Sequence, residues 1–102
     1  FTPALRLPAG TIGEIAVRGP QVTQSYFRYT AADAVHKMKD PADPTGPVWH
    51  RMGDVGYLDD QGRLWMCGRK SHRVTTPDGE LYPECAEQIF NAEGLGLRTA
   101  LV

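Results

Sequence analysis

The stretch that decides the fold is VGYLDDQGRLWMC, residues 55–67. Residues 55–58 and 63–67 are rich in strand-forming side chains, and DDQG at 59–62 lies between them. Gly62 supplies the positive φ that a tight turn needs. The stretch therefore predicts two antiparallel strands, 55–58 and 63–67, joined by the turn 59–62.

Downstream of this hairpin, the pattern changes from strands to a helix. The turn-forming run PDG at 77–79 predicts a second hairpin from residues 73–76 and 80–82. Pro83 suits the first turn of a helix, where its missing N–H costs nothing. We expect a helix over 83–92.

Apolar spacing supports the same helix. Side chains recur at i, i+1, i+4 and i+5, which makes one stripe on a helical surface: Cys85, Ala86, Ile89 and Phe90. Gly94 and Gly96 are expected to end the helix, and RTALV at 98–102 predicts the start of another strand.

Upstream of the hairpin, the predicted elements are shorter. EIAVR at 14–18 alternates apolar and polar residues between glycines, which predicts a half-buried strand. Residues 30–38 start with a threonine cap, and Ala34 and Met38 fall four apart, which predicts a short helix. The prolines that follow cannot continue a helix, so we expect an exposed loop over 40–47 within one domain.

The overall composition limits what the chain can be. Its 102 residues make at most one small domain or part of one, and 41% apolar residues argue against disorder throughout. The formal charge of -1 argues against nucleic-acid binding through a chain-wide surplus of cations. No apolar stretch approaches the ~20 residues that cross a bilayer, so no membrane span is expected.

The number and spacing of cysteines and histidines argue against a disulfide-rich secreted protein and against a metal-binding protein. Cys67 and Cys85 do not make the disulfide framework of a small secreted fold, so we expect reduced thiols in an intracellular protein. The three histidines are scattered and neither cysteine has a CxxC partner, so no metal site is expected. The chain opens at Phe1 without a methionine and ends in the apolar run LRTALV, from which we expect a piece of a longer protein.

Two polar motifs flank the first hairpin. WHRMGD at 49–54 places Asp54 beside a glycine at a strand entrance, where a carboxylate can accept two hydrogen bonds from a vicinal diol. CGRKSHR at 67–73 is rich in cations, and Gly68 is expected to break the strand there. Taken separately, the first motif is better explained as a turn and the second as a solvated edge strand.

Taken together and in order, the motifs resemble a known family. The runs GEIAVRGPQVTQSYFRYTAAD, WHRMGDVGYLDDQGRLWMCGRK and DGELYPECAEQIF are similar to the adenylate-forming superfamily of acyl-CoA synthetases, nonribosomal-peptide adenylation domains and luciferases. The similarity extends over nearly the whole chain.

The resemblance implies roles for three residues. Asp54 matches the ribose-binding aspartate of the family, Arg69 matches the arginine that assists at the ribose hydroxyls, and Ser71 falls at the hinge. Most members carry Asp or Lys at the hinge position. His50 and Met52 stand where the family usually has Tyr and Thr, so two hydroxyls near the nucleotide are missing.

The resemblance also implies an α+β fragment that straddles two domains. Residues 1–67 match the hairpin-rich end of the large N-terminal domain, with its β-barrel-like subdomain, and residues 68–102 match the hinge and the beginning of the small, mobile α/β C-terminal domain. The family uses ATP and Mg²⁺, but its phosphate loop, its magnesium-binding glutamate and its catalytic lysine have no match in this sequence. We therefore expect no catalytic residue and no metal ligand here, and an inactive chain when it stands alone.

The wording of two stretches indicates a branch of the family. CGRKSHRV and TPDGELYPECAEQIF look most like the branch of olefin biosynthesis that uses ATP to close 3-hydroxyacyl chains into β-lactones. This implies that the chain is a segment of a longer cytoplasmic enzyme. The substrates of that enzyme would be ATP and a fatty-acid-type carboxylate. The alternative is a fatty acyl-CoA ligase, whose second substrate is coenzyme A.

A non-enzymatic alternative rests on five side chains expected on adjacent strands: Arg63, Arg69, Lys70, His72 and Arg73. With Tyr57 and Trp65 nearby, they would form a small surface for single-stranded nucleic acid. The 12 acidic residues in the same chain and the lack of a nucleic-acid motif weigh against it, so no nucleic-acid partner is expected.

Overall fold

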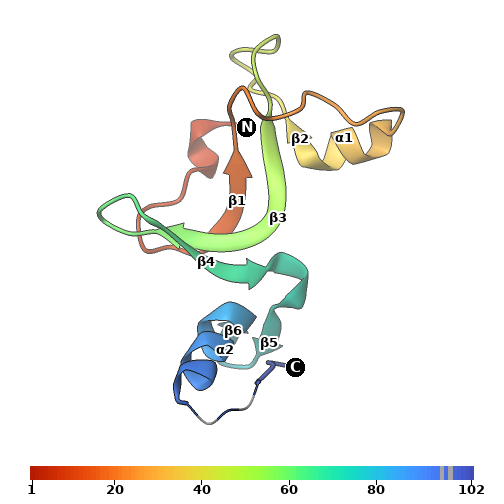
Figure 1. Cartoon of the computed structure of the whole chain (residues 1–102). Helices are drawn as coiled ribbons and strands as arrows, with labels where there is room; N and C mark the ends of the chain where they lie inside the picture. Colours follow the sequence, from red (N-terminus) through yellow and green to blue (C-terminus); the bar gives the residue numbers. More distant parts are fainter. Residues whose placement is uncertain (95, 97) are drawn as a thin grey trace.

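The computed structural model describes residues 1–94, 96 and 98–102, and these residues form an α+β arrangement with two antiparallel sheets. Figure 1 shows the larger sheet in the upper part of the molecule, and a short hairpin with one helix below it. The larger sheet has the order β1-β3-β2, and β4 also pairs with β3. Its strands are β1 (Gly13–Val17), β2 (Lys37–Met38), β3 (Trp49–Leu58) and β4 (Leu64–Arg69).

The remaining elements are short. The second sheet consists of β5 (Val74–Thr76) and β6 (Gly79–Leu81), and α2 (Pro83–Ala92) follows it. The other helical segments are η1 (Pro3–Leu5), α1 (Thr30–His36) and η2 (Lys70–His72). The predicted second hairpin and the predicted helix over 83–92 are thus confirmed.

The first hairpin is also confirmed, and its strands are longer than the sequence pattern predicted. Gly62 has a φ of 75°, and the Asp59 carboxylate accepts hydrogen bonds from the backbone N–H groups of Gln61 and Arg63, at 2.9 Å each. The Trp65 indole also donates to that carboxylate at 2.9 Å. Asp59 therefore organises the turn, rather than lying free in solvent.

The extra strand length corrects two expectations. Residues 49–54 lie inside β3 and not in a turn, because this half of β3 pairs with β1 on one side and β2 on the other. Gly68 does not break β4, which continues to Arg69. Gly68 is buried, and a Cβ built on it would meet Pro83 and Glu84 at the start of α2 at 3.4–3.6 Å, so this strand position packs against the helix.

The segment upstream of β3 differs from the expected helix over 30–38. Helix α1 ends at His36, and Lys37–Met38 forms β2, paired with His50 and Trp49. Tyr29 is the N-cap and makes no side-chain cap bond, so Thr30 is not the cap. Pairing with β3 offers the backbone of these two residues more hydrogen bonds than one further helical turn before a proline-rich loop would.

The end of the chain is not the expected strand over 98–102. It lies against α2 through side chains of the helix: Thr99 donates its N–H and its hydroxyl to Asn91 Oδ1, at 3.0 Å each, and the Leu101 N–H donates to Glu87 Oε1 at 3.0 Å. A strand needs a neighbouring strand, and β5–β6 does not pair with this segment.

Little of the described chain is buried. The buried apolar side chains include Val55 on β3, Cys67 on β4 and Val48, which directly precedes β3. Ile89 and Phe90, in the predicted stripe of α2, are 64% and 59% exposed. The Cα radius of gyration is 16.5 Å, compared with about 13 Å for a compact domain of this size, and the sheet does not close into a barrel within the described residues.

Candidate functional site

Asp54 and Arg69 face each other across the β3–β4 pair. They are direct partners in the strand register, and Arg69 Nη1 lies 3.2 Å from Asp54 Oδ1. The same nitrogen donates to the backbone oxygen of Met52 at 3.0 Å. The Asp54 side chain is 17% exposed and that of Arg69 is 55% exposed, so a shielded carboxylate and an accessible guanidinium lie side by side. The structure therefore brings together two of the three predicted site residues.

Gly53 is required by this geometry. Its φ is +73°, in the left-handed region, and a Cβ at this position would lie 3.5 Å from Arg69 Nη1. A larger residue would strain the backbone, although its Cβ would make only an ordinary contact with the guanidinium. The glycine beside Asp54 thus serves the Asp54–Arg69 pair and does not mark a turn.

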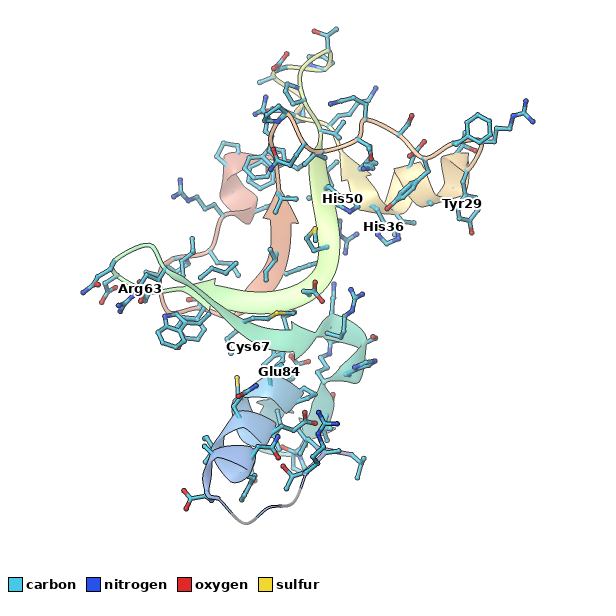
Figure 2. All side chains as sticks on the ribbon, viewed as in Figure 1. Tyr29, His36, His50, Arg63, Cys67 and Glu84 are labelled. Carbon is cyan, nitrogen blue, oxygen red and sulfur yellow. The ribbon has the colours of Figure 1, made fainter. Side chains whose placement is uncertain are left out.

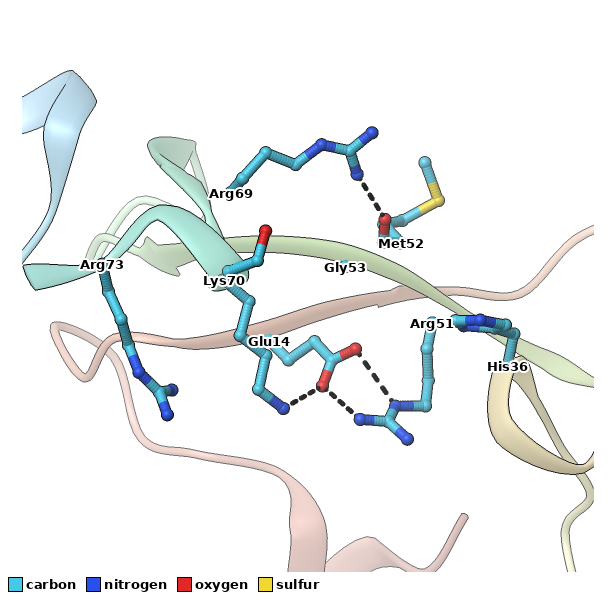
Figure 3. A pocket seen from close by; sticks show the side chains of 9 residues that line it. Glu14, His36, Arg51, Met52, Gly53, Arg69, Lys70 and Arg73 are labelled. Carbon is cyan, nitrogen blue, oxygen red and sulfur yellow. Dashed lines mark hydrogen bonds and ion pairs between the residues drawn. The ribbon is translucent and has the colours of Figure 1, made fainter. Parts of the chain in front are cut away.

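A second charged cluster, of Glu14, Arg51 and Lys70, lies on the other side of β3 (Figure 3). Arg51 Nε and Nη2 donate to the two carboxylate oxygens of Glu14 at 3.1 and 2.7 Å, and Lys70 Nζ donates to Oε2 at 2.9 Å. Sequence reasoning missed this cluster because its members lie on β1, β3 and η2, with no local spacing to connect them. We refer to it below as the Glu14 cluster.

The Glu14 cluster shifts the pKa of its own members. The pKa of Glu14 is lowered from its ordinary value of 4.5 to about 2, chiefly because Arg51 donates to the ionised carboxylate; partial burial opposes this shift and Lys70 adds to it. The hydrogen bond to Glu14 raises the pKa of Arg51 in turn. Glu14 is therefore ionised at neutral pH and accepts hydrogen bonds from two cations.

An open pocket of about 510 Å³ is bordered by the Glu14 cluster and by Arg69, but not by Asp54. It is lined by Glu14, His36, Arg51, Met52, Gly53, Arg69, Lys70, Ser71 and Arg73. Four of these residues are Lys or Arg, and each is paired with a carboxylate: Arg51 and Lys70 with Glu14, Arg69 with Asp54, and Arg73 with Glu80. Ser71, the third predicted site residue, is exposed in η2 and lines the pocket beside Lys70.

Of the two departures from the family motif, Met52 lines this pocket and His50 does not. Met52 is 39% exposed and its side chain lines the pocket. His50 packs edge-on against Tyr26, with ring centroids 6.2 Å apart, and its buried Nδ1 has no hydrogen-bond partner in the described part of the chain. Figure 2 shows His50 and His36 near one another beside the larger sheet.

The cations of the nucleic-acid alternative do not form one free patch. Four of the five are held by carboxylates: Arg63 by Asp59 at 2.6 Å, Arg69 by Asp54, Lys70 by Glu14, and Arg73 by Glu80 at 3.1 Å. Arg63 lies at the tip of the β3–β4 hairpin, and Arg73 follows η2. This pairing weakens the alternative, since counterion release needs cations that phosphates can replace.

The described residues contain neither a metal-binding cluster nor a membrane-spanning helix. Among residues 1–94, 96 and 98–102, no three His, Cys, Asp or Glu side chains come together in a way that would hold a metal ion. None of the helices in these ranges has the length and apolar character to span a bilayer. Both cysteines are free; burial and the neighbouring Cys85 thiol raise the pKa of Cys67 to about 11.

Known proteins with similar sequences cover almost the whole chain. No family model matches it. The olefin β-lactone synthetases of Xanthomonas campestris pv. campestris and Stenotrophomonas maltophilia are each 53% identical over 97 residues, which is 94% of this chain and 17–18% of those proteins. The 2-succinylbenzoate–CoA ligase of Bacillus cytotoxicus is 33% identical over 97 residues. The chain therefore spans less than a fifth of the length of these relatives.

Solved structures give the same result. The O-succinylbenzoate coenzyme A synthetase of Bacillus subtilis, in complex with ATP and magnesium ion, matches with a TM-score of 0.75 at 25% identity, over 98% of this chain and 19% of that one. ATP-bound MatB from Rhodopseudomonas palustris matches with a TM-score of 0.76 at 28% identity, over 94% of this chain and 18% of that one. In sequence and in fold, the chain is a segment of the adenylate-forming enzyme family.

Proposed function

We propose that the full-length protein uses ATP to activate a 3-hydroxy fatty acid as an acyl-adenylate, and then closes this intermediate into a β-lactone in the cytoplasm. The observation that carries the proposal is the difference in identity over the same length. The two olefin β-lactone synthetases are 53% identical over 97 residues, whereas the coenzyme A ligase of Bacillus cytotoxicus is 33% identical.

In this proposal Asp54 and Arg69 bind the ribose. The Asp54 carboxylate, shielded in the sheet, accepts hydrogen bonds from the two ribose hydroxyls, while the guanidinium beside it bonds the same hydroxyls. Hydrogen bonds to a charged group contribute roughly 1.5–3 kcal/mol, enough to hold the nucleotide in one orientation.

The reaction would proceed in two steps. A carboxylate oxygen of the fatty acid attacks the α-phosphorus of ATP, the bond to the β,γ-diphosphate breaks, and pyrophosphate leaves. The 3-hydroxyl oxygen then attacks the activated carbonyl carbon and loses its proton as AMP leaves, which closes a four-membered lactone. Both steps use one site, so the chain after Arg69 would turn between them, with Ser71 as the hinge, relative to the larger sheet.

The described residues supply only part of this machinery. They contain no carboxylate cluster suited to Mg²⁺, so the ion implied by the family finds no ligand set among them, and no step above is assigned to it. The residues that hold Mg²⁺ and protonate or deprotonate the substrate would lie elsewhere in the full-length protein. This chain would contribute nucleotide binding and the connection between domains.

A fatty acyl-CoA ligase is the second candidate, since a coenzyme A ligase that acts on another carboxylate, 2-succinylbenzoate, is among the relatives. The first step is the same in both cases, and only the acceptor differs. A β-lactone synthetase needs the 3-hydroxyl of its own substrate, whereas a ligase needs the thiol of coenzyme A.

One experiment separates the two candidates. Full-length protein is incubated with ATP, Mg²⁺ and either a 3-hydroxy fatty acid or the unsubstituted acid of equal length, with and without coenzyme A, and products are identified by mass spectrometry. We expect pyrophosphate release and a product one water lighter than the 3-hydroxy acid, without coenzyme A. An acyl thioester formed from both acids would instead establish the ligase. No pyrophosphate release with either acid would contradict both candidates.

A further inference from the structure

The Glu14 cluster connects the larger sheet to the segment that leads out of it. Glu14 lies on β1 and Arg51 on β3, whereas Lys70 is the first residue of η2, directly after the end of β4. From η2 the chain continues into β5, β6 and α2, the lower part of Figure 1. The Lys70–Glu14 bond of 2.9 Å is therefore a direct link between the larger sheet and this following segment.

The two cations are bound to Glu14 in different ways. Arg51 makes a two-pronged contact with the carboxylate, and its Nη1 donates to the backbone oxygen of Val35 at 3.0 Å, so it is fixed from two sides. Lys70 makes a single contact and its side chain is 42% exposed. Water can replace the Lys70 contact with little loss, while Arg51 keeps the carboxylate neutralised.

The cluster also lies next to the ribose-binding pair. Arg51 precedes Met52, whose backbone oxygen holds Arg69, and Lys70 follows Arg69 directly. Figure 3 shows Arg69 on one side of β3 and the Glu14 cluster on the other. Glu14 thus bonds to Arg51, which precedes Asp54 on β3, and to Lys70, which follows Arg69.

From this geometry we infer that Glu14 is a positioning residue: through Arg51 and Lys70 it holds the two segments that carry Asp54 and Arg69 in register, and Lys70 is the contact that opens when the chain after Arg69 turns. This inference rests on the proposed function. Because the Arg51 contact remains, Glu14 never becomes an unpaired charge, so the Lys70 contact can open and re-form at low cost.

The test compares Lys70→Met and Glu14→Gln with matched controls in the full-length protein. Lys39→Met removes another exposed lysine, and Asp43→Asn removes a carboxylate from the exposed Arg18 ion pair. Pyrophosphate exchange gives KM for ATP and kcat of the first step, and amide hydrogen exchange reports on residues 70–72.

We expect KM for ATP to rise about threefold in Lys70→Met and about tenfold in Glu14→Gln, with kcat little changed, because one partly exposed contact is lost in the first variant and all three bonds to Glu14 are weakened in the second. Amides of residues 70–72 should exchange faster in both variants, and Lys70→Arg should restore both values. The controls should leave KM and exchange as in the parent protein.

Two results would overturn the inference. Unchanged exchange at residues 70–72 in Lys70→Met would show that Lys70 does not hold this segment. Faster exchange with an unchanged KM for ATP would show that the cluster is structural only. The same conclusion would follow if KM and kcat fell together with thermal stability. If Glu14→Gln does not fold, Lys70→Met decides alone. A parent protein without pyrophosphate exchange contradicts the proposed function, and with it the positioning role, while the amide measurement still reports on the Lys70 contact.

Discussion

Among single residues, the main feature of the site is that each shielded carboxylate lies beside a cationic side chain. Asp54 is shielded but lies 3.2 Å from Arg69, and Glu14 is shielded but accepts bonds from two cations. For Glu14, the hydrogen bonds from Arg51 and Lys70 lower the pKa to about 2, so this carboxylate is an acceptor at neutral pH.

Asp54→Ala should reduce kcat/KM for ATP in the full-length protein by roughly 30- to 150-fold, which corresponds to ~2–3 kcal/mol of lost charged hydrogen bonds. Asp60→Ala is the matched control, since Asp60 is exposed in the β3–β4 turn. Asp59 is unsuitable, because its carboxylate organises that turn. Pyrophosphate release measures both variants, and equal losses would remove Asp54 from the nucleotide site.

Acid should destabilise the fold partly through Glu14. Its pKa in the folded protein is about 2, below the ordinary 4.5, so its contribution is fully present above pH 4.5 and is lost as the pH falls towards 2. Denaturant unfolding of full-length parent and Glu14→Gln protein, between pH 6 and pH 3, should show the smaller pH dependence in the variant. Parallel curves would indicate that the Glu14 cluster contributes no stability.

At the scale of elements, β3 connects the molecule. It pairs with β2 at its start, with β1 along its length and with β4 from Asp54 onward, so one strand carries both Arg51 and Asp54, the partner of Arg69. The short η2 then separates this sheet from the β5–β6 hairpin. A change of direction between the two parts has to be taken up near η2.

Ser71→Pro tests that role. Proline fixes φ near about -65°, which opposes a backbone change at the centre of η2 but does not touch Asp54. In the full-length protein we expect pyrophosphate exchange to be retained and conversion of the acyl-adenylate to be slowed in single-turnover measurements. Ser71→Ala is the control for the lost hydroxyl. A variant of normal thermal stability in which both steps slow equally would argue against a hinge at Ser71.

At the scale of the whole molecule, the exposed apolar surface is the main feature. Val48, Val55 and Cys67 form a small core, whereas Ile89 and Phe90 are largely exposed. Burial of apolar area is the dominant favourable term in folding, so a small core gives little stability.

The 102-residue chain expressed alone should therefore be only marginally stable. In amide hydrogen exchange we expect the strongest protection in the hairpin of residues 55–67, where β3 and β4 pair, and weak protection in α2. Uniform strong protection across the chain would contradict this expectation and show that the core is sufficient by itself.

The sequence by itself determined the elements whose causes are local. Turn chemistry at 59–62 and 77–79 predicted both hairpins, and Pro83 with a helical apolar spacing predicted α2 from its first to its last residue. Asp54 and Arg69 were recognised because each stands in a short contiguous motif. In all these cases neighbouring residues carry the information.

Only the tertiary structure decided what depends on distant partners. Residues 49–54 form part of a strand because β1 and β2 pair with this half of β3. Lys37–Met38 is a strand and not the end of the predicted helix, because it pairs with β3. The Glu14 cluster joins three segments far apart in the chain, and residues 98–102 formed no strand because no neighbouring strand pairs with them. Backbone groups and charged side chains pair with groups that the fold brings close. The spacing of residues along the sequence does not indicate which distant groups these will be.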